Sequence, residues 1–310
     1  MTKVSWCAEV KEYLCERTSN DAGLTRSGKD KRISRCCIEA FLSGALLFSK
    51  KYSLADRTLT VDSAPFSELL TYIFINNMHF VTSVTQKTYR SRELFEVRVE
   101  GREAEKFFSR FAESFDLSDL ITCEECAQYF LRGVFLACGT VTSPDISYHA
   151  EFIAPSEELA GALYSYFLVE GREARLIKRR NNHIVYIKGS ERLSDLFTEI
   201  GATPYAFDVI EKSIEKETRN NINRSCNCEN ANTKRTVSAF LEFKMAVEKI
   251  KGRGEWNALS KELREAAELR LAYPDASLSE LCLYSEAGTI SRSGLNHRLK
   301  KIIEIAKEND

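Results

Sequence analysis

The sequence contains no long apolar run and no secretory leader. Among its 310 residues, no stretch approaches the roughly 18 to 20 uninterrupted apolar residues that span a bilayer, and the best candidate is only residues 41–48. Charged side chains interrupt the apolar ones throughout residues 1–17, so a signal peptide is absent as well. These absences argue against membrane and secreted proteins, and they predict a cytoplasmic protein.

Cysteine is abundant, but its spacing is a poor match to a metal site. The ten thiols should stay reduced in the cytosol, mostly as small buried side chains. Cys123 and Cys126 form a C-x-x-C, and Cys226 and Cys228 form a C-x-C about a hundred residues later. Because C-x-C is a poor half-site for zinc, we expect no metal and no cofactor.

Charge is distributed unevenly along a chain that is long enough for two or three domains. Residues 219–310 carry 16 Lys and Arg against 13 Asp and Glu, a net charge of +3. The first 218 residues carry 28 against 32, a net charge of −4. A polyanion such as DNA should therefore prefer the C-terminal part.

The first two thirds of the chain contain an internal repeat. Residues 41–47 (FLSGALL) recur 89 positions later as residues 130–136 (FLRGVFL), and both segments are typical of helices. Strand-like and helix-like segments then follow each copy in the same order. We predict an α+β fold, with two αββαββα halves followed by a separate all-α domain.

Gly44 and Gly133 occupy matching positions in the two repeated helices. Without β-carbons they would let the helix backbones approach closely, so we predict that the two helices form the interface between the halves. Alternatively, the helices are simply buried and the glycines are incidental.

This duplicated unit resembles the LAGLIDADG homing-endonuclease fold, in which two such helices carry catalytic acids near their ends. Alignment with that motif places non-acidic residues at the former catalytic positions: Leu47, Ser49, Leu136 and Cys138. Magnesium needs hard oxygen ligands, which these side chains do not supply. Asp145 lies nearby, but in a turn beyond the helix. We predict a scaffold without nuclease activity.

Basic residues in the predicted strands raise a second question. They could line a DNA-binding sheet, although an ordinary solvated strand face is the favoured interpretation because this part of the chain is net acidic. The residues concerned are Lys87, Arg90, Arg92, Arg98, Lys178, Arg179, Arg180 and Lys188.

Two linking helices are expected after the repeat. The first spans residues 205–224, with apolar residues such as Phe207, Ile210 and Ile214 at helical spacing. An asparagine-rich patch follows, in which Asn227 or Asn230 could cap the second helix.

Three further helices are predicted from Trp256 onward. Ser277 and Glu280 have the spacing of a capping box at the start of the second. Gly288 lies in the following turn, and Thr289 or Ser291 caps the third helix. Its apolar residues recur at i, i+4, i+7 and i+11, which indicates one buried face: Leu295, Leu299, Ile302 and Ala306.

The third helix is basic and has no acid before Ile303. A basic helix after a short helix and a glycine turn is typical of a helix-turn-helix recognition helix, although a solvated basic face is the plainer alternative. Side chains in its first turns would read bases: Ser291, Arg292, Ser293, Asn296 and His297. Those further along would contact phosphates: Arg298, Lys300 and Lys301.

The chain as a whole resembles the WhiA family of bacterial regulators. That resemblance implies a degenerate LAGLIDADG-like region, a C-terminal helix-turn-helix, a role in sporulation or in cell division and chromosome segregation, and no catalysis. The motifs that carry it are Glu9-Val10-Lys11-Glu12, Cys36-Cys37, Tyr129-Phe130-Leu131-Arg132-Gly133, Asn227-Cys228-Glu229-x-Ala231-Asn232, and the decapeptide Ile290-Ser291-Arg292-Ser293-Gly294-Leu295-Asn296-His297-Arg298-Leu299.

These interpretations predict four segments: a first half with an N-terminal helix (1–120), a second half (121–204), linking helices (205–251) and a helix-turn-helix domain (252–310, motif about 277–308). Double-stranded DNA is the expected partner, with a protein partner on the N-terminal region and no membrane. An active LAGLIDADG-type endonuclease and a protein-interaction adaptor that carries a helix-turn-helix are the alternatives.

Overall fold

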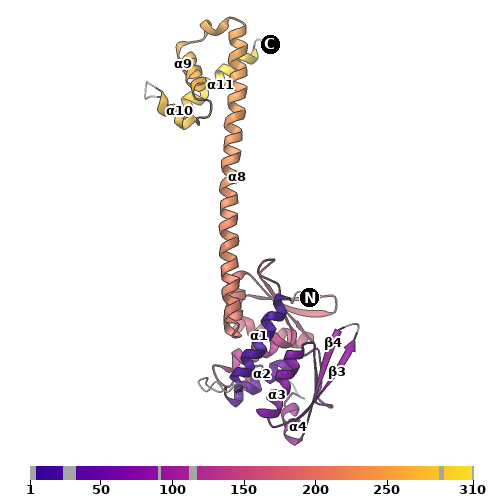
Figure 1. Ribbon diagram of the computed structural model, residues 1–310. Helices are drawn as coiled ribbons and strands as arrows, with labels where there is room; N and C mark the ends of the chain where they lie inside the picture. Colours follow the sequence, from indigo (N-terminus) through magenta and orange to yellow (C-terminus); the bar gives the residue numbers. More distant parts are fainter. Residues whose placement is uncertain (1–4, 24–32, 90–91, 112–116, 286–289, 309–310) are drawn as a thin grey trace. The chain divides into compact units, whose positions relative to one another are not determined.

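The computed structural model describes residues 5–23, 33–89, 92–111, 117–285 and 290–308 (Figure 1). It divides into two compact units, Met1–Lys216 and Glu217–Asp310. In the described ranges, no helix is both long enough and apolar enough to cross a bilayer.

The N-terminal unit contains two four-stranded antiparallel sheets with matching strand orders, β1-β2-β4-β3 and β5-β6-β8-β7. Alternate residues of the central strands, such as Val97 and Val99, are fully buried, as the period-two pattern predicts. The strands are β1 (Lys51–Ser53), β2 (Thr58–Val61), β3 (Val81–Tyr89), β4 (Arg92–Glu100), β5 (Gly139–Val141), β6 (His149–Ala154), β7 (Ala174–Arg179) and β8 (Asn182–Lys188).

The helices of this unit complete the repeat, which confirms the predicted α+β class and the αββαββα order of each half. Equivalent serines begin equivalent helices: Ser63 caps α3 and Ser156 caps α6, each accepting a backbone N–H three residues on. The helices are α1 (Trp6–Asp21), α2 (Arg35–Leu47), α3 (Ala64–Asn76), α4 (Arg102–Ser109), the 3₁₀ turn η1 (Leu117–Leu120), α5 (Cys126–Cys138), α6 (Glu157–Val169) and α7 (Ser190–Glu199).

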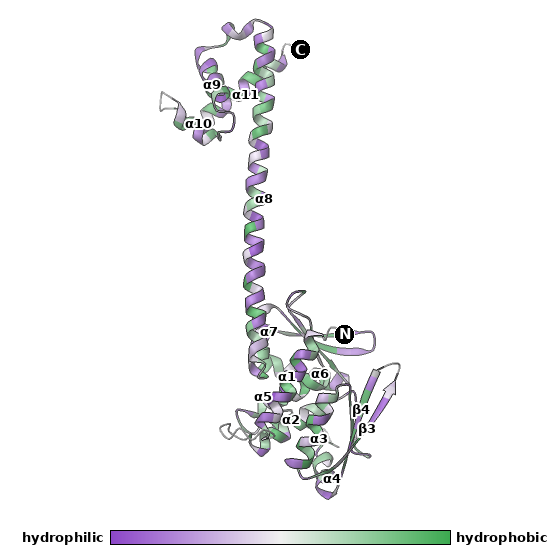
Figure 2. Cartoon of the chain, viewed as in Figure 1, coloured by the Kyte–Doolittle hydropathy of each residue, from purple (hydrophilic) through white to green (hydrophobic). Residues whose placement is uncertain are grey.

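The repeated helices α2 and α5 lie side by side in the interior of this unit (Figure 2). A β-carbon on Gly44 would lie 2.4 Å from the carbonyl oxygen of Phe130, and one on Gly133 would lie 2.2 Å from that of Phe41. Both distances are far below van der Waals contact, so the two backbones touch where only glycine fits.

A buried arginine connects α5 to the rest of the unit. The Arg132 side chain is fully buried and pairs with Asp21 at 2.8 Å, from Nη1 to Oδ2. Its Nε donates to the carbonyl oxygen of Ile200 at 2.7 Å, and its guanidinium lies over the ring of Tyr129. Because a buried charge needs full compensation, this network holds α1, α5 and the end of α7 in one arrangement.

The predicted pair of linking helices is wrong. Residues 203–252 form one continuous helix, α8 (Thr203–Gly252), so neither Asn227 nor Asn230 caps a second helix. The asparagine-rich patch is fully exposed within it. The expected apolar face is also exposed, since Phe207 is 66% and Ile214 is 60% accessible. Asparagine is a good N-cap residue, but a cap contributes only about 1 kcal/mol. The uninterrupted hydrogen-bond ladder of α8 on both sides overrides it.

The C-terminal unit is helical, as predicted. After the exposed part of α8, the chain forms the 3₁₀ turn η2 (Glu255–Ala258), α9 (Lys261–Ala272), α10 (Leu278–Tyr284) and α11 (Arg292–Glu308), which cluster around the end of α8 (Figure 1). Its separate core joins α8 residues such as Phe243 and Ile250 to Leu281, Leu295 and Ile302.

Gly133→Ala tests the helix contact, with Gly161→Ala as a matched control. The first substitution forces a backbone shift and should destabilise the N-terminal unit by about 2–3 kcal/mol or more. Gly161 lies within α6 with no neighbour near its missing β-carbon, so alanine there should be neutral or stabilising by up to about 1 kcal/mol.

Urea unfolding in a Trp256→Phe background provides the measurement, because Trp6 then reports on the N-terminal unit alone. Equal unfolding midpoints for the two alanine variants would contradict the proposed close contact.

Candidate nucleic-acid interface

The capping box at the start of α10 is present, as predicted. The Ser277 backbone N–H donates to the Glu280 carboxylate at 2.7 Å, and the Glu280 backbone N–H donates to the Ser277 hydroxyl at 3.3 Å. The Ser277 backbone N–H, and after it the Ser277 hydroxyl, hold the pKa of Glu280 below its usual value. Local side chains therefore determine where this helix begins.

Ser291 caps the helix that follows. Its hydroxyl accepts the Gly294 backbone N–H at 3.1 Å, and its carbonyl oxygen accepts the Leu295 N–H at 2.9 Å. The predicted turn residue Gly288 and the alternative cap Thr289 lie outside the described residues. The first helical residue is Arg292, so the expected base-reading positions fall in the first turns of α11.

The buried face of α11 is the predicted one. Leu295, Leu299, Ile302 and Ala306 are all buried and pack against the core of the C-terminal unit. The 3.6-residue period then leaves the opposite side of the helix in solvent.

The polar residues of α11 divide into three groups around this buried face. Ser293, His297 and Lys301 are exposed on the side opposite the core, with Lys300 at its edge. Arg292 and Asn296 instead border a hollow between α11 and α8, and Arg298 is half-buried on the other flank. Seven of the eight predicted residues therefore share α11 but not one surface, and the eighth, Ser291, precedes the helix as its cap.

The hollow beside α11 has a volume of about 800 Å³. It lies entirely within the C-terminal unit, and Arg292, Asn296 and Lys300 of α11 line it. Its α8 residues, such as Arg235 and Thr236, were not predicted as site residues, because they belong to a segment that was predicted to be a linker. The spacing of apolar residues along the sequence does not indicate that these side chains lie beside α11.

Arg298 is half-buried, and its charge acts on the start of α9. Its positive charge contributes to lowering the pKa of Glu262 at the start of α9, after the larger effects of Glu262's own backbone N–H and the Ser260 hydroxyl. A phosphate contact by Arg298 would therefore compete with this carboxylate.

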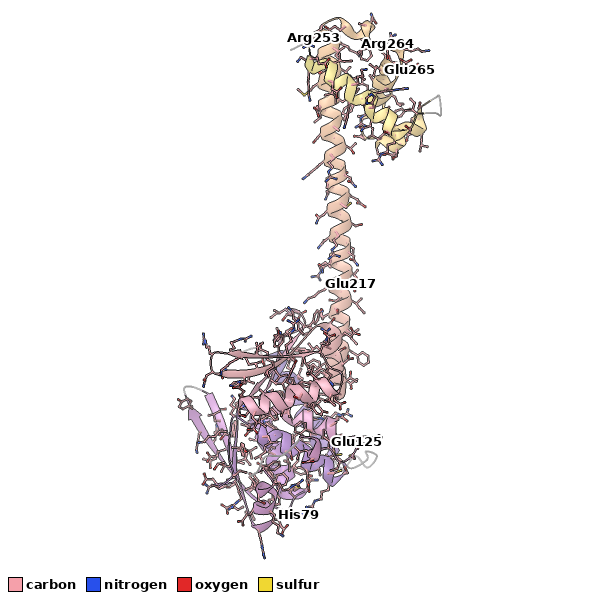
Figure 3. All side chains as sticks on the ribbon, turned by 180° about the vertical axis from the view of Figure 1, so that it is seen from behind. His79, Glu125, Glu217, Arg253, Arg264 and Glu265 are labelled. Carbon is pink, nitrogen blue, oxygen red and sulfur yellow. The ribbon has the colours of Figure 1, made fainter. Side chains whose placement is uncertain are left out.

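The buried Arg270 side chain connects α9 to neighbouring segments of the C-terminal unit. Arg270 of α9 is buried, donates to the carbonyl oxygens of Ala276 and Thr236, and lies over the ring of Phe240. It thus links the turn before α10 to α8. Figure 3 shows the side chains that cover the unit, with Arg264 and Glu265 on α9 and Arg253 just after α8.

The ends of α2 and α5 carry lysines rather than clustered acids. Leu47, Ser49 and Leu136 are buried, and burial raises the pKa of the Cys138 thiol to about 12. The Lys11 ammonium donates to the carbonyl oxygen of Leu136 at 3.1 Å, at the C-terminal end of α5.

Two acids do lie near these helix ends, and each has a lysine partner. Lys50, directly after α2, pairs with Asp62, whose pKa falls because hydrogen bonding and charge from Lys50 outweigh its burial. Asp145 is exposed in its turn, 4.0 Å from the ammonium of Lys212.

The basic residues of the two sheets are partly neutralised by acids beside them. Lys87 pairs with Glu96 at 2.8 Å, and Arg179 pairs with Glu151 at 3.1 Å. Arg98, Arg180 and Lys188 are exposed. Lys178 lies 4.0 Å from Glu157. Arg90 and the side chain of Arg92 lie outside the described residues.

The cysteines are not grouped as the sequence analysis considered. Cys226 and Cys228 are exposed on α8 in the C-terminal unit, whereas Cys123 and Cys126 lie in the N-terminal unit beside the adjacent pair Cys36 and Cys37. The pair at 36 and 37 had been noted only as a family motif. Its proximity to the C-x-x-C depends on how α2 packs against α5.

Comparison with known families decides the classification. Residues 127–219 match the family described as the WhiA LAGLIDADG-like domain, and residues 222–306 match the WhiA C-terminal HTH domain. The chain belongs to the WhiA family. It therefore combines a LAGLIDADG-like domain with a C-terminal helix-turn-helix domain, as its motifs predicted.

Individual relatives agree with this classification. The probable cell division protein WhiA of Clostridium botulinum strain Hall is 29% identical over 320 residues, covering 98% of both chains. Its counterpart in Clostridium perfringens strain SM101 is 40% identical over 190 residues, covering 61% of this chain and 60% of the relative. The crystal structure of full-length DUF199/WhiA from Thermotoga maritima shares the fold, with a TM-score of 0.57, 21% identity, and coverage of 98% of this chain and 99% of that one.

Proposed function

We propose that this chain is a sequence-specific transcription regulator that binds double-stranded DNA through α10 and α11. The observation that carries the proposal is the exposed face of α11, where Ser293, His297, Lys300 and Lys301 lie opposite the buried stripe. A helix presented in this way, after a short capped helix, can enter the major groove. The positive charge of the C-terminal part supports the same partner.

Base readout is proposed for Ser291, Arg292, Ser293, Asn296 and His297, and phosphate contact for Arg298, Lys300 and Lys301. Arg292 has the planar donors that pair with guanine, and Asn296 can pair with adenine. Arg292 and Asn296 both border the hollow next to α8. They therefore reach DNA only if the edge of the major groove lies over that side of α11.

The N-terminal unit is proposed to act as a scaffold that does not cleave DNA. Phosphodiester cleavage by this fold requires carboxylates at the ends of α2 and α5, and Leu47, Ser49, Leu136 and Cys138 supply none. We further propose that this unit contacts a protein partner, and that Gly44 and Gly133 serve only its internal helix interface.

The process is inferred from the relatives, which are named as probable cell division proteins. We propose that the chain acts at the nucleoid in the cytoplasm, in cell division and chromosome segregation or in sporulation. A protein-interaction adaptor remains the second candidate for the C-terminal unit, and sequence-independent DNA binding would favour it.

Paired alanine variants test the division between base and phosphate contacts. On DNA selected from a random pool by the wild-type chain, Arg292→Ala should lose about 1–3 kcal/mol of discrimination at one base position. Lys300→Ala should weaken binding to all sequences alike and reduce the salt slope by about one. Binding titrations at several salt concentrations provide both values.

Lys87→Ala is the matched charge-removal control, because Lys87 lies on β3 of the N-terminal sheet and is paired with Glu96. It should leave affinity unchanged. Equal, sequence-independent losses from Arg292→Ala and Lys300→Ala would refute the division, and a loss from Lys87→Ala would assign DNA binding to the sheet as well.

Supercoiled plasmid incubated with the full chain and Mg²⁺ should remain supercoiled, as followed on agarose gels. Conversion to relaxed or linear DNA would support the endonuclease alternative if Asp62→Asn or Asp145→Asn abolished it. Cleavage that survives both substitutions would indicate a contaminating nuclease instead.

A further inference from the structure

Four cysteine thiols converge at one end of the helix pair α2 and α5. The Sγ atom of Cys123 lies 3.5 Å from that of Cys37, 3.7 Å from that of Cys36 and 3.3 Å from that of Cys126. The Sγ atoms of Cys37 and Cys126 are 3.9 Å apart, and all four lie within 4.8 Å of one another. In the described part of the chain, this is the one group of side chains spaced to hold a metal ion.

These separations match the geometry of a zinc tetrathiolate. With Zn–S bonds of about 2.3 Å, the sulfur atoms of a regular tetrahedron are about 3.8 Å apart. Four of the six sulfur–sulfur distances are 3.3–3.9 Å, close to that value. A disulfide would join only one pair, at about 2.05 Å.

Helix packing explains how distant residues form this group. Cys36 and Cys37 lie in the first turn of α2, and Cys126 begins α5, with Cys123 in the turn before it. Cys37 lies beside Cys126, and Gly44 lies beside Phe130, so the two helices run in the same direction and begin at the same end. The glycine contact therefore sets the distance between the cysteine pairs.

The surroundings suit thiolates. Cys36, Cys37 and Cys126 lie in the first turns of α2 and α5, where helix backbone N–H groups contribute partial positive charge. Neither helix has an acid in its first turn, and Glu125 is the residue before α5. The Ser34 hydroxyl lies 3.0 Å from the Sγ atoms of Cys36 and Cys37. Its hydrogen bond is the main reason that the pKa of the Cys36 thiol is lowered to about 6.

The thiols of Cys37 and Cys126 are buried. Burial raises the pKa of both Cys37 and Cys126, which disfavours their thiolate forms. A bound dication would reverse that preference, because metal coordination deprotonates thiols. Cys123 is exposed and Cys36 half-buried, which provides a path for the ion.

We propose that Cys36, Cys37, Cys123 and Cys126 bind one structural zinc ion, which clamps the N-terminal ends of α2 and α5. All four positions are occupied by protein, so the site is closed and has no open position for a substrate. No metal was expected from the sequence, because the C-x-x-C was weighed as one ligand set with Cys226 and Cys228. The proposal is independent of DNA binding.

The full-length wild-type chain, reduced and dialysed against zinc and then metal-free buffer, should hold about one zinc per chain by elemental mass spectrometry. Cobalt substituted for zinc should give the visible d–d bands of a tetrahedral site and thiolate-to-cobalt charge-transfer bands. A wild-type chain that remains metal-free, or that forms a disulfide among these cysteines under the reducing conditions, would overturn the proposal.

Single variants identify the ligands. Cys36→Ser and Cys123→Ser change the two more accessible thiols and should weaken zinc binding more than about 100-fold in a chelator competition, since even an indirect partner costs 10- to 100-fold. The control Cys226→Ser/Cys228→Ser removes two exposed thiols of the other unit and should bind zinc as the wild type does.

Retention of zinc by both single variants, or its loss in the control, would contradict the assignment. Near-ultraviolet circular dichroism of each variant shows whether it is folded. If a variant unfolds, the zinc content and cobalt spectrum of the wild-type chain still decide the question.

Discussion

In the N-terminal unit, the backbones of α2 and α5 approach so closely that neither Gly44 nor Gly133 has room for a β-carbon. This contact sets the spacing of the two halves, because α2 belongs to the first half and α5 to the second. It also places the start of α2 beside the start of α5, where the four cysteines meet. Arg132, one residue before Gly133, extends the same constraint to α1 through Asp21.

The two units have different physical characters. The N-terminal unit carries net negative charge and places uncharged side chains where a LAGLIDADG enzyme has acids, with Lys11 bonded to the end of α5. The C-terminal unit is small and net positive, and its core depends on the last turns of α8. The proposed scaffold role is compatible with this helix interface, because packing and catalysis use different residues.

The α+β class, the repeat and the helical C-terminal unit followed from periodicity and from side chains that act locally, such as the Ser277–Glu280 capping box. The buried face of α11 was equally predictable, since 3.6-residue spacing needs no partner to be recognised. The predicted break near Asn227 was wrong, because α8 is continuous there. The capping preference of asparagine, worth about 1 kcal/mol, competed there with helix propagation from both sides, and the helix continued.

The sequence by itself determined the family, the order of the elements and the residue content of α11, because these depend on contacts between near neighbours in the chain. Only the tertiary structure decided that Arg292 and Asn296 border a hollow with α8, that the charge of Arg298 acts on Glu262, and that four cysteine thiols from two separate segments lie together. Each of these depends on how helices pack at long sequence separation, which residue spacing along a single chain does not encode.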